Sequence, residues 1–238
     1  MSITPSKDLL EEIYTRLIES NDLCNWWPIK YDRLSTDGFE ISAGAILVQN
    51  TSWHNAELAL DQLNQASLWG YQAVYDCKLE DLASVIRPSG YYNTKAKKLR
   101  SFAQVVVEEF NGDDAKLFAQ KMPELRARLL SIYGIGEETA DDIILYAAKK
   151  PSFVIDAYTR RLIDRLGVFV AGETYTDYQN IFETNLSPKA ELWGEFHAQI
   201  DKHAAMICTK RSPMCSECVL LDLCDTGRAN TDQTQIAE

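Results

Sequence analysis

The sequence lacks the features that mark membrane and secreted proteins. No apolar run approaches the roughly 20 residues that a helix needs to cross a bilayer. The first residues, MSITPSKDLLEEIYTRLIES, contain no basic segment followed by an apolar stretch, which a secretory signal requires. We therefore expect a cytoplasmic protein that acts without a membrane.

Positive charge is also scarce, because 24 Lys and Arg residues face 35 Asp and Glu residues, for a net charge of −11. Averaged over the whole chain, this balance argues against nucleic acid as a partner, but one basic face can be enough for binding. The stretch RPSGYYNTKAKKLR, residues 87–100, holds five basic residues and no acid. It is either a local basic patch, with Lys95 and Lys97 as DNA contacts, or an ordinary solvated helix face.

Strand patterns are few, and no internal repeat is found. Apolar residues recur instead at helical spacing, and glycine and proline divide the chain into short segments. The sequence therefore predicts an all-α fold, with a polar tail from residue 226 that frays. Helices are expected over residues 6–20, 56–67, 95–110, 115–122, 123–132, 137–150 and 156–170.

Four of the six cysteines are gathered in CTKRSPMCSECVLLDLC, with the spacing C-x6-C-x2-C-x5-C. Disulfides are disfavoured in a cytoplasm, so a compact thiolate cluster indicates a metal. Zinc sites usually show two close pairs, whereas here only one pair is close. The spacing favours a [4Fe–4S] cluster held by Cys208, Cys215, Cys218 and Cys224. Zinc and no metal remain the alternatives.

The stretch LLSIYGIGEETADD contains a glycine turn that opens a helix. Gly134 and Gly136, on either side of Ile135, can adopt backbone angles closed to other residues. The N–H groups at the start of the next helix suit a DNA phosphate. Asp141 and Asp142 are expected to face solvent on that helix. A lone GxG is weak evidence, so the surrounding motifs decide its meaning.

The GIG turn, the following FVIDAYTRRL and the cysteine loop together resemble the helix–hairpin–helix DNA glycosylases of the endonuclease III superfamily. GAILVQNTSWHNA is similar to another segment of that family. The resemblance covers residues 31–224 and implies two α-helical lobes with DNA in the cleft between them. One lobe, a six-helix barrel with the hairpin, would span residues 31–150. The other, with the cluster loop, would combine residues 1–30 and 151–238.

The resemblance also implies roles for single residues. Asp156 matches the family's catalytic aspartate, although it also suits the N-cap of the next helix. Gln49 matches the residue that fills the space left by the flipped base. Arg160, Lys210 and Arg211 are expected to contact DNA, the last two as phosphate contacts.

Two departures from the family's motifs restrict which reaction the enzyme is expected to catalyse. Bifunctional members carry a lysine where this chain has Glu138, and a carboxylate cannot form the imine that strand cleavage needs. The adenine-mismatch branch needs a glutamate four residues before Gln49, where Ala45 stands. The expected enzyme is therefore a monofunctional glycosylase that uses Asp156 and water, with Glu138 among its substrate-binding residues.

With no acid aligned to protonate the base, the leaving group should already be a good one, such as an alkylated purine. WWP, RPSGYYNTKAK and GIGEETAD resemble stretches of the bacterial 3-methyladenine DNA glycosylase branch, which implies that Trp26 or Trp27 and Trp53 sandwich the base. Stacking and cation–π attraction would select a cationic base. The best-known member of that branch lacks the cysteines, so this implication stops before the C-terminal region.

Other functions stay open at this point. The alternatives are an endonuclease III-like glycosylase and AP lyase for oxidised pyrimidines, a lyase that uses another amine, and a non-catalytic lesion-binding iron–sulfur protein. The expected partner is double-stranded DNA with a damaged base, bound by a monomer at the bacterial nucleoid. The isolated His54, His197 and His203 are assigned polar or packing roles.

Overall fold

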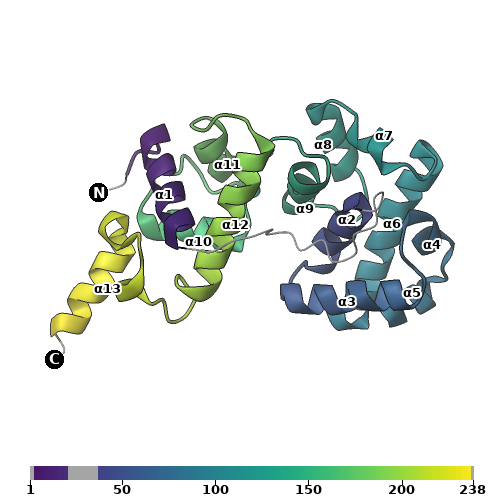
Figure 1. Cartoon of the computed structure of the whole chain (residues 1–238), viewed down its shortest axis with the longest axis horizontal. Coiled ribbons are helices and arrows are strands. Elements are labelled where there is room, and N and C mark those ends of the chain that lie inside the picture. The colour runs from purple at the N-terminus through teal and green to yellow at the C-terminus, as the bar shows by residue number, and fades with distance from the viewer. Residues whose placement is uncertain (1–2, 21–36, 237–238) are drawn as a thin grey trace. The chain divides into compact units, whose positions relative to one another are not determined.

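The computed structural model describes residues 3–20 and 37–236. Within these ranges the chain is helical, and its one β contact is an isolated bridge between Ile3 and Val168 (Figure 1). The predicted all-α class is confirmed. None of the described helices combines the length and the apolar character that spanning a membrane would demand.

The chain divides into two compact units. The first combines Met1–Trp26 with Pro151–Glu238, and the second is the continuous segment Trp27–Lys150. Both ends of the chain therefore belong to one unit, and the other is an insertion between them.

The inserted unit is built around helix α2 (Asp37–Leu47). Residues 39–47 are all buried, including the polar Glu40 and Ser42, so this helix is enclosed on every side. The longest neighbour is α6 (Tyr92–Phe110), which buries one apolar stripe. The other helices are α3 (Trp53–Gln65), α4 (Tyr71–Asp76), α5 (Leu79–Val85), η1 (Arg87–Ser89), α7 (Asp114–Phe118), α8 (Met122–Leu130), α9 (Glu137–Asp142) and η2 (Ile143–Ala147).

The terminal unit packs around a cluster of aromatic rings. Phe153 stacks on Phe182 with 3.8 Å between ring centroids, and Phe196 meets both edge-on. Its helices are α1 (Lys7–Ser20), α10 (Ala157–Leu166), α11 (Tyr175–Glu183), α12 (Ala190–Met206), η3 (Cys215–Glu217), η4 (Leu221–Leu223) and α13 (Asp225–Ile236). Helices α10 and α12 pack against one another, and this contact positions the site described below.

The prediction of a frayed tail from residue 226 is wrong, because α13 continues to Ile236. This helix starts directly after Cys224, whose Sγ accepts a hydrogen bond from the N–H of Gly227 at 3.2 Å. An ion pair between Arg228 and Asp225 adds support in the first turn. Contacts with the cysteine loop therefore stabilise the first turn of this helix. The polar composition of the tail does not reveal that effect.

Candidate functional site: a helix–turn–helix hairpin, a capped aspartate and a cysteine loop

The glycine turn joins α8 to α9 in the inserted unit. Gly134 has a φ of +85°, which disfavours any residue with a side chain. A Cβ there would also lie 2.2 Å from Cγ of Lys98, so the stem of Lys98 packs against the turn itself. Gly136 is exposed and starts α9 without a side-chain cap. Ile135, between them, is buried.

A buried ion pair holds the two helices of the hairpin together. Arg126 of α8 donates from Nε and Nη2 to the two carboxylate oxygens of Asp141 at 2.9 and 3.0 Å. Asp141 is fully buried and Asp142 is 9% exposed, so the expectation that both face solvent is wrong. A bidentate Arg partner allows a carboxylate to be buried where isolated charge would be unfavourable.

Gln49, the predicted wedge residue, is tied to this hairpin. Its Nε2 donates to the carbonyl of Gly134 at 3.2 Å and to Oγ1 of Thr139 at 2.8 Å. Its Oε1 accepts a hydrogen bond from Nζ of Lys98 at 2.5 Å. Both ends of the amide are therefore engaged within the unit. Gln49, Lys98, Tyr91 and neighbouring residues line a cavity of about 380 Å³.

The two lysines predicted to contact DNA lie in different surroundings. Lys97 is exposed. Lys95 is only 2% exposed, and its Nζ donates to the carbonyls of Leu47 and Ser89 at 2.8 and 2.6 Å. Burial, with a contribution from Lys98, lowers the pKa of Lys95 to about 8. The prediction of a surface DNA contact at Lys95 is therefore wrong, since this amine binds main-chain carbonyls.

The predicted base-pocket residues are only partly described. Glu138 is exposed in the first turn of α9. Trp53 is the first residue of α3 and packs, half-buried, against the core of its unit. Trp26 and Trp27 lie outside the described residues, so the predicted sandwich is not placed.

Asp156, in the terminal unit, is the N-cap of α10. Its Oδ1 accepts the N–H of Thr159 at 2.7 Å, so the capping role foreseen for it is real. Its side chain is 17% exposed, whereas the preceding residues 152–155 are buried. A buried strand-like segment thus delivers one carboxylate to the surface at the start of a helix.

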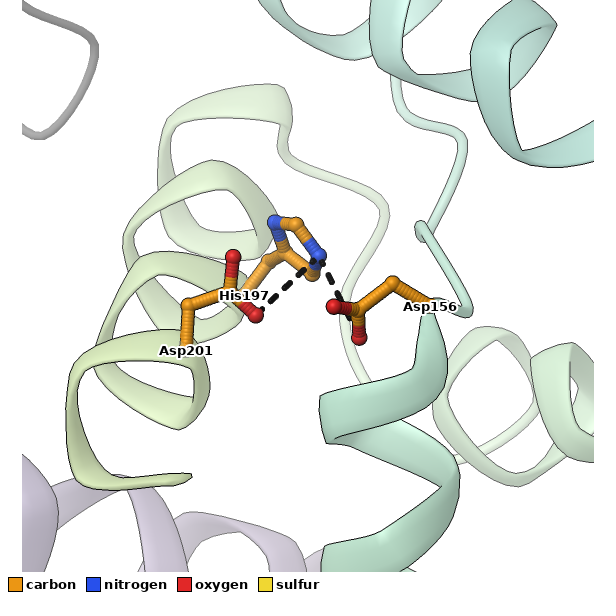
Figure 2. A group of neighbouring side chains, drawn as sticks. All are labelled: Asp156, His197 and Asp201. Atoms are coloured by element: carbon orange, nitrogen blue, oxygen red, sulfur yellow. Dashed lines mark ion pairs between the residues drawn. The ribbon is translucent and has the colours of Figure 1, made fainter. Parts of the chain in front are cut away.

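A histidine and a second aspartate, both missed by the sequence reasoning, lie beside Asp156 (Figure 2). Nε2 of His197 is 4.0 Å from Oδ1 of Asp156 and 3.8 Å from Oδ1 of Asp201. Burial lowers the pKa of His197, although Asp156 opposes this shift, so the imidazole is neutral at neutral pH. The available signal was the H-x3-D spacing, which places His197 and Asp201 on one face of a helix.

Two arginines that follow Asp156 stay within the terminal unit. Arg160 stacks on the ring of Tyr178, 4.5 Å from its centroid, and donates to the carbonyl of Glu173. Arg161 donates to the carbonyls of Ala204 and Cys208, at the end of α12. Arg160 is half-buried, while Lys210 and Arg211 are both exposed in the cysteine loop.

The four clustered cysteines line one cavity. Cys208 and Cys224 are buried, and Cys215 and Cys218 are half-buried. Burial and the three neighbouring sulfurs raise the pKa of Cys218 to about 11. Four thiols that hinder one another's ionisation suit a metal centre, because a bound cation stabilises thiolates.

Hydrogen-bond donors surround these sulfur atoms. Among the described residues, Nη1 of Arg165 donates to Cys208 (3.1 Å), the N–H of Gly227 to Cys224 (3.2 Å) and Nδ2 of Asn230 to Cys215 (3.4 Å). Nε2 of the buried His203 lies 3.4 Å from Sγ of Cys218, and burial lowers the pKa of this histidine to about 4. The donor set and its surroundings fit an iron–sulfur cluster, whose sulfurs accept such hydrogen bonds.

Comparison with known proteins identifies related sequences. Residues 43–188 match the family model described as HhH-GPD superfamily base excision DNA repair protein. A Methanocaldococcus jannaschii protein named as a DNA repair glycosylase is 38% identical over 218 residues, covering 91% of this chain and 96% of its own. The endonuclease III of Thermotoga maritima is 28% identical and covers 81% of this chain and 85% of its own.

Solved structures agree with this grouping. The H. pylori 3-methyladenine DNA glycosylase bound to 1,N6-ethenoadenine has a TM-score of 0.69 and 25% identity, covering 84% of this chain and 96% of its own. An endonuclease III in a non-covalent complex with DNA has a TM-score of 0.78 at 20% identity, covering 95% and 99%. The latter similarity concerns the fold alone.

Proposed function

Because the chain belongs to the HhH-GPD superfamily of base excision DNA repair proteins, we propose that it is a monofunctional DNA glycosylase that releases alkylated purines such as 3-methyladenine from DNA. The observation that carries this proposal is that the chain has both a partly exposed carboxylate at Asp156 and a glutamate, Glu138, where a lyase would have its lysine.

Asp156 supplies the chemistry in this proposal. The C1′–N bond breaks, and its electron pair leaves with the base, so positive charge develops on the sugar. The carboxylate stabilises this charge and accepts a proton from the water whose oxygen bonds to C1′. The N-cap hydrogen bond from Thr159 fixes the carboxylate at the start of a rigid helix.

Glu138 argues against strand cleavage by the lysine route. It is exposed at the first turn of α9, and its carboxylate cannot form an imine with C1′. Lys95 offers no replacement, because its amine is buried and bound to two carbonyls. Lys98 is engaged with Gln49. The expected product is therefore an intact strand with an abasic site.

We infer the substrate class from the absence of a carboxylate at position 45. Ala45 is buried, so no carboxylate stands there to protonate a neutral base. Bases alkylated at N3 or N7 are already cationic and leave without such help. The similarity to a 3-methyladenine DNA glycosylase supports this choice. Trp53, together with Trp26 or Trp27, remains our proposed stacking partner.

DNA contacts are proposed in both units. In the inserted unit they are the main chain of Gly134–Ile135–Gly136 and the ammonium of Lys97, with Gln49 filling the gap left by the extruded base. In the terminal unit they are Arg160, Lys210 and Arg211. The side chains of Lys97, Lys210 and Arg211 are all exposed, which supports this assignment.

We further propose that Cys208, Cys215, Cys218 and Cys224 hold a [4Fe–4S] cluster. When bound, the cluster supplies structural cross-linking of the loop that carries Lys210 and Arg211. Arg165 reinforces that loop, since it donates to the carbonyls of Thr209 and Lys210 at 2.9 and 3.0 Å. Purified protein should absorb near 400 nm, roughly as thiolate-bound iron–sulfur proteins do, and should contain iron rather than zinc.

The function is tested by incubating the purified protein with methylated double-stranded DNA and separating the released bases by chromatography. We expect 3-methyladenine or 7-methylguanine from the wild type and none from Asp156→Asn. Borohydride should trap no covalent adduct on abasic DNA. Release of oxidised pyrimidines with adduct formation would instead identify an endonuclease III-like lyase, and no release from any damaged DNA would identify a binding protein.

A further inference from the structure

The atoms of Asp156, His197 and Asp201 lie too far apart for direct hydrogen bonds and farther apart than the ligands of tetrahedral zinc (Figure 2). One atom from each residue contributes, and all three atoms lie within 4.8 Å of one another. The two measured separations, 3.8 and 4.0 Å, exceed the ~3.2 Å limit of a good hydrogen bond. Tetrahedral zinc at about 2.0 Å would draw its nitrogen and oxygen ligands to about 3.3 Å of one another.

A water molecule matches these spacings. Hydrogen bonds of roughly 2.8 Å in a tetrahedral arrangement place their partner atoms about 4.6 Å apart. At an angle of about 90° at the water oxygen, the same bonds of roughly 2.8 Å span separations of 3.8 and 4.0 Å. Polar contacts longer than 3.5 Å are often bridged in this way.

The donor and acceptor pattern is also right for one water. His197 is buried and neutral, and its Nε2 faces two carboxylate oxygens, so the tautomer with the proton on Nε2 fits. A water would accept that N–H and donate its two hydrogens to Oδ1 of Asp156 and Oδ1 of Asp201. Three of its hydrogen bonds would thus be satisfied.

We propose that His197 and Asp201 are positioning residues for Asp156, which they hold by jointly binding one water molecule. This inference rests on the proposed catalytic role of Asp156. His197 and Asp201 come from successive turns of α12, a 17-residue helix that packs on α10, so their spacing is rigid. The cap bond and the water both use Oδ1 of Asp156, which leaves Oδ2 for the sugar and its attacking water.

The functional test compares five variants, among them Asp156→Asn, in single-turnover base release from methylated DNA. His197→Phe keeps a ring but lacks the donor, and Asp201→Leu keeps a similar volume but lacks the acceptor oxygen. We expect both to slow the chemical step on the order of 10- to 100-fold, the effect of a small misplacement of a reacting group. Their Kd for DNA should not change. His197→Gln restores an N–H near Nε2 and should recover most of the rate.

Glu191→Gln, an exposed change on the same helix, is the matched control and should behave as wild type. If His197→Phe does not fold, Asp201→Leu and His197→Gln carry the test. Wild-type rates in folded Asp201→Leu and His197→Phe, with Asp156→Asn inactive, would overturn the positioning role and leave the proposed function standing. Full activity in Asp156→Asn would overturn the proposed function itself.

A high-resolution crystal structure provides an independent measurement. The proposal expects a density peak about 2.6–3.2 Å from Nε2 of His197 and from the two Oδ1 atoms, the range of hydrogen bonds. A peak at about 2.0–2.2 Å from all three atoms, typical of zinc, would show a metal site instead and overturn the proposal. No peak at this position would also overturn it.

Discussion

Two carboxylates, one in each unit, are held in opposite ways. Asp141 of the inserted unit is fully buried and forms a bidentate ion pair with Arg126 at 2.9 and 3.0 Å. Asp156 of the terminal unit is partly exposed. Its Oδ1 lies 4.0 Å from Nε2 of His197, which is neutral. One carboxylate is paired directly with an arginine, and the other lies beside a neutral imidazole.

This difference separates a structural role from a chemical one. An arginine in contact with a carboxylate stabilises a buried site but neutralises the charge that could act on a substrate. A backbone N–H and a neutral imidazole orient a carboxylate without cancelling its charge. The environment of each residue, rather than its type, therefore indicates which aspartate is the better candidate for catalysis.

The largest effect on activity is expected when the charge of Asp156 is removed. Asparagine is about as good an N-cap as aspartate, so Asp156→Asn should leave the melting temperature close to wild type. Base release should fall by about 10²- to 10⁴-fold, the usual contribution of a positioned acid or base. Thermal melting and single-turnover kinetics on the same preparation measure both quantities. A large loss of stability would place Asp156 with Asp141 as a structural residue.

Removing the arginine partner of Asp141 should reduce the stability of the inserted unit. Arg126→Met leaves the buried Asp141 without its bidentate partner and should lower the free energy of unfolding by roughly 3 kcal/mol. The matched control is Arg128→Met, two residues later on α8, which removes a partly exposed pair with Glu109 and should lower it by less than about 1 kcal/mol. Urea denaturation compares them, and equal losses would contradict the assignment of a buried, essential pair.

A smaller effect is expected at the hairpin turn. Gly134→Ala places a side chain at a positive φ and against the stem of Lys98, and should lower the free energy of unfolding by about 1–2 kcal/mol. Gly136→Ala has open space and an ordinary φ, so only the poorer N-cap of α9 should count, with an effect of about 0.5–1 kcal/mol. Chemical denaturation of the two variants would show whether the turn geometry matters at Gly134 alone.

The smallest effect should distinguish the exposed Lys97 from the buried Lys95. Lys97→Gln should weaken DNA binding uniformly and reduce the slope of log K against log salt by about 1, as expected when one phosphate contact is lost. Lys95→Gln should leave that slope unchanged and lower the melting temperature instead, because it disturbs two hydrogen bonds to carbonyls. Salt titrations by fluorescence anisotropy measure the slopes.

Much of the fold could be predicted from periodicity. The helix expected over residues 95–110 lies within α6 (Tyr92–Phe110), and the helix expected over 6–20 corresponds to α1. The burial of Lys95 was also readable, because Lys95, Leu99, Phe102 and Val106 are spaced at four, three and four residues on one face. The basic character of the surrounding stretch concealed that signal.

The candidate site was harder to predict, because its residues meet only through tertiary packing. His197 lies 41 positions after Asp156 and reaches it across the contact between α10 and α12, which no local pattern specifies. Asp141 was misjudged for the same reason, since its partner Arg126 belongs to the preceding helix. The spacing of the cysteines was informative because four ligands of one loop lie close together in sequence.

Helix α10 connects the carboxylate of Asp156 to the cysteine loop. Asp156 caps its first turn, and Arg165, in its last turn, donates to Sγ of Cys208 and to the carbonyls of the cysteine loop. Ten residues of helix span about 15 Å and resist bending. The helix therefore gives the carboxylate of Asp156 and the arginine that holds the cysteine loop one common support, so the position of each depends on the same short segment.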